Sequence, residues 1–296
     1  MQIIGADQQG TEKSPRSSQS IVAELQQWRK SRQSGQVIGL VPTMGALHEG
    51  HLSLIRQARR ECDVVALTIF VNPTQFAPGE DLDSYPRTLD SDLQLAEQEG
   101  VDLVWLGNSR DLYPTGFATT VAVPELADRL CGKSRPHHFG GVCLIVLKLF
   151  QLFQPTKAFF GEKDLQQVTI IERMVTDLHV DTEIVRCPLV RENDGLAMSS
   201  RNVRLTAEDR QRALSLSKAL FAIEESWRGG ERMVHSLIEE AMAILDPDLE
   251  LEYLEIVDRN DLSPVVREAD GDVAVCIAAR AGEVRLIDNI SLEFLS

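Results

Sequence analysis

From Val64 to Val71 the chain is apolar at every position except Thr68. A strand that is apolar on both faces suits a sheet covered on both sides, as in parallel α/β proteins. Such strand patterns alternate with helical patterns, and this alternation predicts a Rossmann-like, doubly wound parallel sheet of the α/β class. The predicted strands also cover 37–41, 101–106, 157–160 and 182–187, and the helices cover 52–62, 88–99, 141–153 and 165–177.

The pattern changes near Val190. Thr206 followed by acidic residues is typical of a helix start, and Gly229-Gly230 is typical of a helix end. We therefore predict a Rossmann-like domain at 20–189 and a smaller C-terminal α+β lid domain at 190–296, after a mobile N-terminal arm at 1–19. In the lid domain, a second helix is expected at 231–245 and strands near 250–258, 273–279 and 283–289.

Composition excludes several classes of function. The net charge of −15 argues against broad nucleic-acid binding, which needs a basic face, although a local basic pocket is enough for ATP. No apolar run reaches the roughly 18 residues of a membrane span, and the start of the chain has no signal-peptide pattern. The five cysteines show no CxxC spacing, which predicts reduced thiols and a cytoplasmic protein.

The segment Met44–His51 lies where a predicted strand passes into a predicted helix. Ligands of open α/β sheets bind at such junctions, and the free N–H groups of a helix N-terminus favour anions. His48 and His51 therefore suggest phosphate chemistry, with glycines at 45 and 50 allowing close backbone approach. Their spacing does not fit the H-E-x-x-H zinc motif. The structural alternative is a pair of capping histidines satisfied by nearby carbonyls.

Two further segments carry polar groups at the ends of predicted strands. Asn72 and Gln75 offer amide donors and acceptors suited to a hydroxy acid, and the alternative is an Asn-Pro turn. In Gly161–Asp164, Lys163 suits a phosphate and Asp164 suits Mg²⁺, and the alternative is a helix start capped by Asp164.

The segment Met198–Asn202 places two hydroxyl groups and a guanidinium at the predicted domain boundary. Such a loop can close over phosphates, and the alternative is an ordinary linker. Asp90 and Asp92 could help to hold a metal, although a solvated acidic helix start is the favoured interpretation. The segment Arg135–Phe139 is interpreted as a basic element of the site, and the alternative interpretation is an ordinary surface loop.

Together these segments resemble the pantoate–β-alanine ligases, or pantothenate synthetases, a family of the nucleotidyltransferase superfamily with a HIGH-type histidine pair and a KMSKS-type loop. The motifs are P-T-M-G-A-L-H-E-G-H, F-V-N-P-T-Q-F, G-E-K-D and G-L-A-M-S-S-R-N, and the match spans roughly residues 20–290. The resemblance implies a homodimeric enzyme that joins pantoate to β-alanine using ATP and Mg²⁺ through a pantoyl-adenylate, releasing AMP and diphosphate. His138 matches the family's R-P-x-H-F motif, with His137 in its variable position.

The resemblance also implies roles for individual residues. It assigns pantoate to Gln75 and Gln167, with Gln75 also near β-alanine. It makes His51 the proton donor and places Asp90 near Mg²⁺. The chemistry of the side chains suggests further roles. His48 and Lys163 are candidate donors to the reacting phosphate, Asn72 is a candidate substrate contact and Asp164 is a second metal candidate. The implied ATP-binding residues are Met44, Gly45, Ala46, Leu47, His48, Glu49, Gly50, His51, Gly161, Glu162, Lys163, Asp164, Val190, Met198, Ser199, Ser200 and Arg201.

Two other functions are compatible with parts of the pattern. A phosphopantetheine adenylyltransferase-like enzyme would adenylylate a phosphate, but such an acceptor should require more basic residues than the amides at 72, 75 and 167 provide. A nucleotide-binding sensor built on an inactive synthetase would bind ATP without turnover. The chain also has no G-x-x-x-x-G-K-[ST] loop, so we expect no fused nucleotide kinase domain.

Overall fold

The computed structural model describes residues 1–5 and 21–294, which form two compact units. The first unit comprises Met1–Pro124, Arg135–Gly161 and Ile170–Cys187. The second comprises Glu125–Ser134, Glu162–Thr169 and Pro188–Ser296. Each unit is built around its own sheet, and the sheets differ in type.

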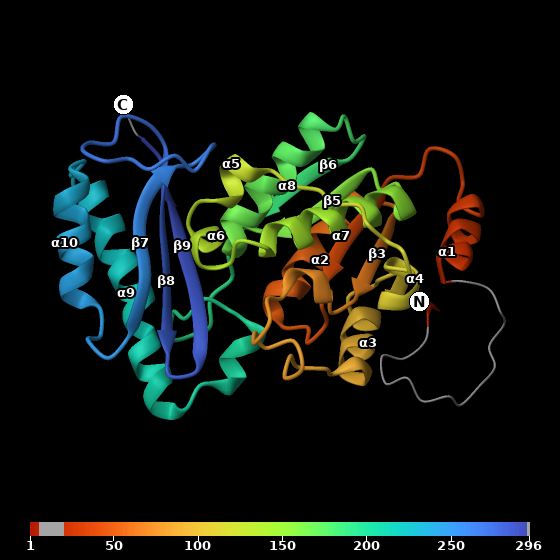
Figure 1. Cartoon of the computed structure of the whole chain (residues 1–296), viewed down its shortest axis with the longest axis horizontal. Helices are drawn as coiled ribbons and strands as arrows, with labels where there is room; N and C mark the ends of the chain where they lie inside the picture. Colours follow the sequence, from red (N-terminus) through yellow and green to blue (C-terminus); the bar gives the residue numbers. More distant parts are fainter. Residues whose placement is uncertain (6–20, 295–296) are drawn as a thin grey trace. The chain divides into compact units, whose positions relative to one another are not determined.

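Among the described residues, six strands form one parallel sheet in the first unit, in the order β1-β4-β3-β2-β5-β6. Figure 1 labels β3, β5 and β6 of this sheet. This arrangement confirms the predicted Rossmann-like α/β class. The run Val64–Val71 supplies β3, all of whose residues are buried. The strands are β1 (Gln2–Ile4), β2 (Ile38–Thr43), β3 (Val64–Ile69), β4 (Leu103–Leu106), β5 (Lys157–Gly161) and β6 (Glu183–Cys187).

Apolar side chains cover both faces of this sheet. On one face, Val65 and Leu67 join a buried cluster with Ile55 and Ala58 of α2. On the other, the Trp105 ring lies 5.9 Å from that of Phe153 in α7, in an edge-on contact. The helical elements of this unit are α1 (Ile21–Lys30), α2 (Glu49–Glu61), η1 (Pro73–Gln75), α3 (Leu89–Gln98), α4 (Ser109–Leu112), α7 (His138–Phe153) and part of α8 (Leu165–Asp177).

The order of the strands creates a switch point at β2. Along the chain, β3 and β4 follow on one side of β2, and β5 then pairs on its other side, with Leu40 opposite Ala158. The connections that leave the carboxyl ends of β2 and β5 therefore run in opposite directions. In open α/β sheets, ligands bind outside the strand ends at this point. The segment Met44–His51 follows β2 directly.

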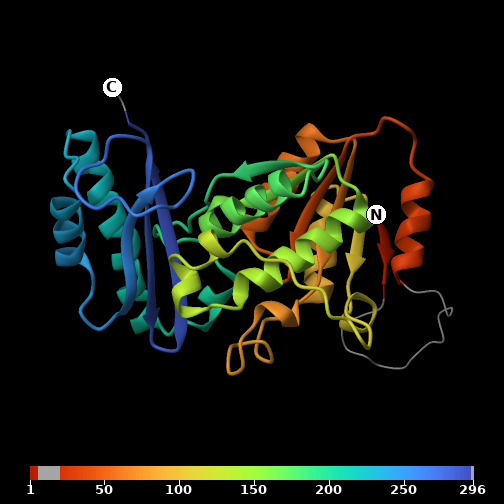
Figure 2. The ribbon, with the colours of Figure 1, turned by 45° about the horizontal axis from the view of Figure 1, so that its top comes forward.

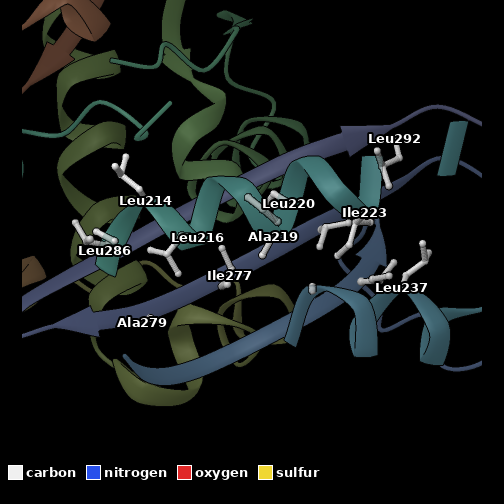
Figure 3. Close-up of a cluster of buried hydrophobic side chains, with 14 of the residues drawn as sticks. Leu214, Leu216, Ala219, Leu220, Ile223, Leu237, Ile277, Ala279, Leu286 and Leu292 are labelled. Carbon is white, nitrogen blue, oxygen red and sulfur yellow. The ribbon is translucent and has the colours of Figure 1, made fainter. Parts of the chain in front are cut away.

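The second unit contains an antiparallel sheet of β7 (Glu250–Asp258), β8 (Val273–Ala281) and β9 (Val284–Leu292). Helices α9 (Ala207–Arg228) and α10 (Val234–Ile244) lie along the same side of it (Figure 2). Thr206 caps α9 by accepting a hydrogen bond from Asp209 N at 3.1 Å, as its sequence predicts. Leucines of α9 point toward the apolar strands and form the core (Figure 3). The remaining short elements are α5 (Pro124–Ala127), α6 (Cys131–Ser134), η2 (Glu162–Asp164) and η3 (Ser200–Arg204).

Two features differ from the sequence expectation. Gln2–Ile4, assigned to the predicted arm, forms an edge strand that pairs with β4 and buries Ile4. Three residues are too few to show a strand pattern. Residues 6–20 of the arm lie outside the described residues. In addition, Glu125–Ser134 and Glu162–Thr169 belong to the second unit, because the Gln166 amide hydrogen-bonds backbone groups of the first of these segments.

No helix in the described part of the chain is long and apolar enough to cross a membrane.

The core of the second unit provides a test of this packing. Leu220 of α9 is fully buried, so Leu220→Ala should lower the free energy of unfolding by about 2–5 kcal/mol, through lost transfer energy and a residual cavity. Met242 of α10 is 48% exposed, and Met242→Ala should change stability by only about 0.5 kcal/mol. Denaturant unfolding of both variants measures the difference, and equal effects would contradict the packing described for α9.

Candidate active site

The loop between β2 and α2 has a strained backbone. Gly45 has φ +84° and Ala46 has φ +51°, both in the left-handed region. A Cβ added at Gly45 would lie 3.0 Å from an Asp92 carboxylate oxygen and 3.1 Å from Ile69 Cγ2, so this position requires glycine. Gly45 N donates to Thr43 Oγ1 at 3.2 Å, and the turn directs the next two N–H groups, those of Ala46 and Leu47, toward one point.

Asp92 of α3 occupies that point. Its Oδ2 accepts a hydrogen bond from Ala46 N at 2.9 Å, and its Oδ1 accepts one from Leu47 N at 2.8 Å. Thr88 Oγ1 donates a third bond to Oδ1 at 3.0 Å. Asp92 is 1% exposed, so its predicted place in a solvated acidic helix start is wrong. The buried carboxylate accepts hydrogen bonds from backbone N–H groups, and these bonds hold the loop in its left-handed conformation.

The two histidines lie side by side at the start of α2, with ring centroids 4.1 Å apart. His48 is the N-cap residue, and its backbone N–H donates to His51 Nδ1 at 3.3 Å. Because Nδ1 of His51 accepts this bond, the neutral ring carries its proton on Nε2. His51 thus takes part in a cap through a backbone N–H and not through the carbonyls that the capping alternative named, and this bond selects the tautomer in which His51 Nε2 is a donor.

The other residues of this loop have separate surroundings. Glu49 is exposed and forms an ion pair with Arg56. The Gly50 carbonyl accepts a hydrogen bond from Ser53 Oγ at 2.8 Å. Met44 Sδ lies 3.2 Å from Gln75 Nε2, which places the predicted substrate amide against the loop that follows β2.

Gln75 ends the short η1 helix and is held by its backbone. Its carbonyl oxygen lies 2.8 Å from His138 Nδ1, and Arg135 Nη2 donates to it at 3.4 Å. Arg135 is fixed in turn by an ion pair with Glu80 at 2.7 Å. Arg135 and His138 therefore support the Gln75 backbone, whereas Pro136 and His137 between them are exposed.

In the second unit, the segment Glu162–Asp164 is anchored by Asn289 of β9. Asn289 Nδ2 donates to the carbonyl oxygens of Glu162 and Lys163, each at 2.9 Å. The Glu162 carboxylate pairs with Arg259 at 3.3 Å. Lys163 Nζ lies 3.9 Å from Asp164 Oδ2, so Asp164 serves as an ionic neighbour of the lysine.

The adjacent glutamines of α8 have different roles. Gln166 is 5% exposed and hydrogen-bonds the carbonyl oxygens of Leu126 and Arg129 and the N–H of Cys131. The Gln167 side chain makes no hydrogen bond to the described residues of the chain and is half-buried. Gln166 is therefore structural, whereas the Gln167 amide retains its capacity for a ligand.

The segment from Val190 to Arg201 is a structured hairpin and no simple linker. Met198 N donates to the Val190 carbonyl at 3.0 Å. Arg191 forms two hydrogen bonds with the buried Asp288 carboxylate, at 2.6 and 3.0 Å. Burial raises the pKa of Asp288, and the Arg191 guanidinium opposes that rise. Asp288 precedes Asn289, so β9 fixes both this hairpin and the Glu162–Asp164 segment.

The hydroxyl-rich end of this hairpin begins the short helix η3. Ser199 is the N-cap residue, and its Oγ accepts a hydrogen bond from Arg201 N at 3.3 Å. Asn202 is 6% exposed and donates to Glu192 Oε1 at 2.6 Å and to the Ala197 carbonyl at 3.0 Å. These contacts hold Ser199–Arg201 on a defined path.

The two carboxylates proposed for a metal do not belong to a preformed cage. Within residues 1–5 and 21–294, no group of three or more His, Cys, Asp or Glu residues is arranged to hold a metal ion. Asp90 is exposed, and the Asp164 side chain is 46% exposed. Each offers one accessible carboxylate, which suits Mg²⁺ held mainly by phosphate oxygens and water.

The predicted site residues thus divide between the units. The first unit brings together Met44, the histidine pair and Gln75, with Asn72 beside Gln75. The second contains Lys163, Asp164, Gln167 and the 190–201 hairpin. No sequence motif singled out the supporting residues Asp288 and Asn289. Their signal is a pair of polar residues in the middle of an apolar strand pattern.

Comparison with known proteins gives a consistent result. The family model described as pantoate-beta-alanine ligase matches residues 17–291. The pantothenate synthetase of Thermotoga petrophila is 49% identical over 263 residues, covering 88% of this chain and 94% of the relative. That of Acetivibrio thermocellus is 48% identical, covering 90% and 95%.

Solved structures agree. The crystal structure of pantothenate synthetase from Thermus thermophilus superposes with a TM-score of 0.86 at 44% identity, covering 91% of this chain and 96% of that one. The pantoate-beta-alanine ligase of Francisella tularensis, solved in complex with beta-gamma ATP and beta-alanine, gives a TM-score of 0.76 at 36% identity, covering 91% and 95%.

The loop anchor can be tested by Asp92→Asn. The new amide would direct an N–H group at the backbone N–H of Ala46 or Leu47, so one loop bond is lost. Because hydrogen bonds to charged groups contribute about 1.5–3 kcal/mol, we expect the KM for ATP to rise about 10–100-fold. Steady-state kinetics with ATP measure this change. Glu97→Gln, an exposed carboxylate on the same helix, is the control; equal behaviour of the two variants would refute the anchor.

The second anchor can be tested by Asn289→Ala. This change leaves the Glu162 and Lys163 carbonyls without their donor and should lower turnover about 10-fold or more by displacing Lys163. Initial rates at saturating ATP give the measurement. Asn260→Ala removes an exposed amide of the same unit and should retain the parent rate. Parent-like turnover in Asn289→Ala would show that β9 does not position Lys163.

Proposed function

Because the chain belongs to the pantoate–β-alanine ligase family, we propose that the residues described above carry out the family's reaction in this protein. It is an ATP-dependent ligase that condenses pantoate with β-alanine to pantothenate. The observation that supports the residue assignment best is the loop at the switch point, where the Asp92 anchor and the His48–His51 contact set the direction of a ring donor.

The reaction has two steps. An oxygen of the pantoate carboxylate attacks the α-phosphorus of ATP, the bond to the β-phosphate oxygen breaks, and diphosphate leaves. The β-alanine amine then attacks the acyl carbon of the pantoyl-adenylate, loses a proton and expels AMP. Negative charge builds on phosphate oxygens in the first step, so donors already directed at them lower the barrier most.

We assign these donors to the histidine pair, to Lys163 and to the segment Ser199–Arg201. His51, with the Nε2–H tautomer set by the His48 backbone, donates to the phosphates, and His48 and Lys163 add further donors. The ATP-binding set is the one inferred from the motifs, with Gly45, Ala46 and Leu47 acting through the shape of the loop, since the N–H groups of the last two contact Asp92. Ser199, Ser200 and Arg201 complete the phosphate contacts.

Pantoate is assigned to Gln75 and Gln167. Gln75 lies beside the Met44 loop, and the Gln167 amide makes no hydrogen bond within the described residues. Asn72 contributes by holding Gln75, since Asn72 Nδ2 donates to Gln75 Oε1 at 3.2 Å.

Magnesium would accompany ATP as a phosphate-bound ion, and when bound it neutralises phosphate charge. Asp164 and Asp90 are the candidate carboxylates, and the single accessible carboxylate at each fits an ion whose other ligands are not protein groups. We also propose that the protein is a cytoplasmic homodimer. All five cysteines are buried and free of disulfide bonds, which supports a reducing compartment.

The function and its donors are tested together by AMP release. Under turnover conditions, the parent enzyme should release AMP only when pantoate and β-alanine are both present. His51→Ala and Lys163→Ala should each lower turnover about 10²–10³-fold, the usual effect of removing a donor to developing charge. The exposed His235 and Lys218 serve as matched controls when changed to alanine. Activity within about tenfold of the parent in both site variants would overturn the assignment.

A further inference from the structure

We propose that Tyr113 and Asn72 act as positioning residues that fix the Gln75 side-chain amide with its Nε2–H₂ group toward pantoate, so that the site selects an oxygen acceptor. This inference rests on the proposed function, because it takes pantoate as the ligand of Gln75. It adds Tyr113, which no motif of the sequence singled out, and it assigns a direction to the Gln75 amide.

Backbone groups decide which way the Asn72 amide points, and the Tyr113 hydroxyl helps to hold it in that orientation. Asn72 is 1% exposed. Its Oδ1 lies 3.3 Å from Thr74 N, and its Nδ2 lies 3.1 Å from the Gly141 carbonyl oxygen. A backbone N–H can only donate and a carbonyl oxygen can only accept. In the reversed orientation Nδ2 would face the Thr74 N–H and Oδ1 would face the Gly141 carbonyl oxygen. Donor would then face donor and acceptor would face acceptor in a buried site, so only one orientation of Asn72 is possible.

The orientation of Asn72 then determines that of Gln75. Asn72 Nδ2 donates to Gln75 Oε1 at 3.2 Å, so Oε1 is occupied as an acceptor. Gln75 Nε2 faces Met44 Sδ at 3.2 Å, and a thioether sulfur is a weak acceptor. A substrate oxygen would be a stronger partner for this NH₂ group. A carboxylate can only accept hydrogen bonds, so a fixed NH₂ donor selects for it.

Tyr113 supplies the shortest contact to Asn72. Its hydroxyl donates to Asn72 Oδ1 at 2.8 Å, while Thr74 Oγ1 donates to the same oxygen at 2.9 Å. Burial raises the pKa of Tyr113, which keeps the hydroxyl protonated and therefore a donor. The ring is held edge-on against Phe117 at 5.4 Å, and Lys148 Nζ lies 5.6 Å from its centroid.

The network requires helix α7 to come very close to η1. A Cβ added at Gly141 would lie 2.2 Å from the Thr74 carbonyl oxygen and 2.6 Å from Gln75 N. Only glycine permits this approach, and the approach lets the Gly141 carbonyl reach Asn72 Nδ2. Three segments of the first unit therefore meet at one amide: α7, η1 and the residue after α4.

The first variant to test is Tyr113→Phe, which removes one donor to Asn72 and keeps the ring. We expect the KM for pantoate to rise about 3–10-fold, the size of one hydrogen bond, with kcat and the KM for ATP within about twofold of the parent. Asn72→Asp replaces Nδ2 by an acceptor, so Gln75 must reverse its amide and present Oε1. For this variant we expect about a 10²-fold loss of kcat/KM for pantoate.

Phe117→Leu is the matched control, because it removes the ring contact and leaves the Tyr113 hydroxyl in place. It should retain the parent KM for pantoate. A purely structural role of Tyr113 would instead give equal effects in Tyr113→Phe and Phe117→Leu and raise the KM values of all three substrates, which would overturn the proposal.

The outcomes also separate this inference from the proposed function. A parent enzyme that forms no AMP with pantoate, β-alanine and ATP contradicts the function itself. An active parent with an unchanged pantoate KM in Tyr113→Phe contradicts only the positioning role. If Asn72→Asp does not fold, as thermal denaturation would show, the comparison of Tyr113→Phe with Phe117→Leu decides the matter.

Discussion

The parallel pairing of β2 with β5 is the constraint on which the functional end of the first unit depends. The chain builds β3 and β4 on one side of β2 and then returns to place β5 on the other side. The segments that follow β2 and β5 therefore leave neighbouring strand ends in different directions, and ligands of open α/β sheets bind outside such strand ends. The histidine pair follows the first of these strands, and the Gly161–Asp164 motif begins at the end of the second. Both motifs therefore start from strand ends that one pairing makes neighbours.

Strand order brings a segment to the edge formed by the carboxyl ends of the strands, but it does not decide where an N–H or an amide points. Apolar burial is non-directional, so a packed core cannot specify such details. Buried polar groups do so in this protein. Asp92 turns the loop after β2, Asn72 orients Gln75, and Asn289 holds the backbone at Glu162 and Lys163. Each of these three side chains is buried, where an unpaired polar group would be costly.

The sequence was sufficient for the larger elements. The apolar run at 64–71 predicted β3, and Thr206 with Gly229-Gly230 predicted the limits of α9, because these signals are local. The edge strand at Gln2–Ile4 was missed because three residues show no period. The unit to which Glu162–Thr169 belongs could not be predicted either, since its Gln166 partners lie about 40 residues earlier in the chain.

The same distinction applies to the site. The motifs identified the histidines, Gln75 and Lys163, whose residue types and spacing are themselves the signal. Residue type alone does not separate Asp90 from Asp92, or Gln166 from Gln167, because each pair consists of near neighbours on one helix with the same chemistry; only the family resemblance named Asp90 and Gln167. Which member is buried depends on a partner far away in sequence: Ala46 and Leu47 for Asp92, and the Leu126 carbonyl for Gln166.

The anchors around Gln75 and Lys163 show two ways in which a buried amide can act. Asn289 bonds two carbonyl oxygens and so fixes the path of the backbone that carries Lys163. Asn72 is itself fixed by a backbone N–H and a backbone carbonyl, and it passes that direction on to the Gln75 side chain. An amide in an isolated pair can reverse, because both orientations can be satisfied by rotating the partner. An amide whose oxygen and nitrogen both bond backbone groups cannot reverse, because peptide groups held in η1 and α7 do not rotate. The main chain therefore determines which way the donor proposed for pantoate points, and the Tyr113 hydroxyl adds a hydrogen bond that holds this orientation.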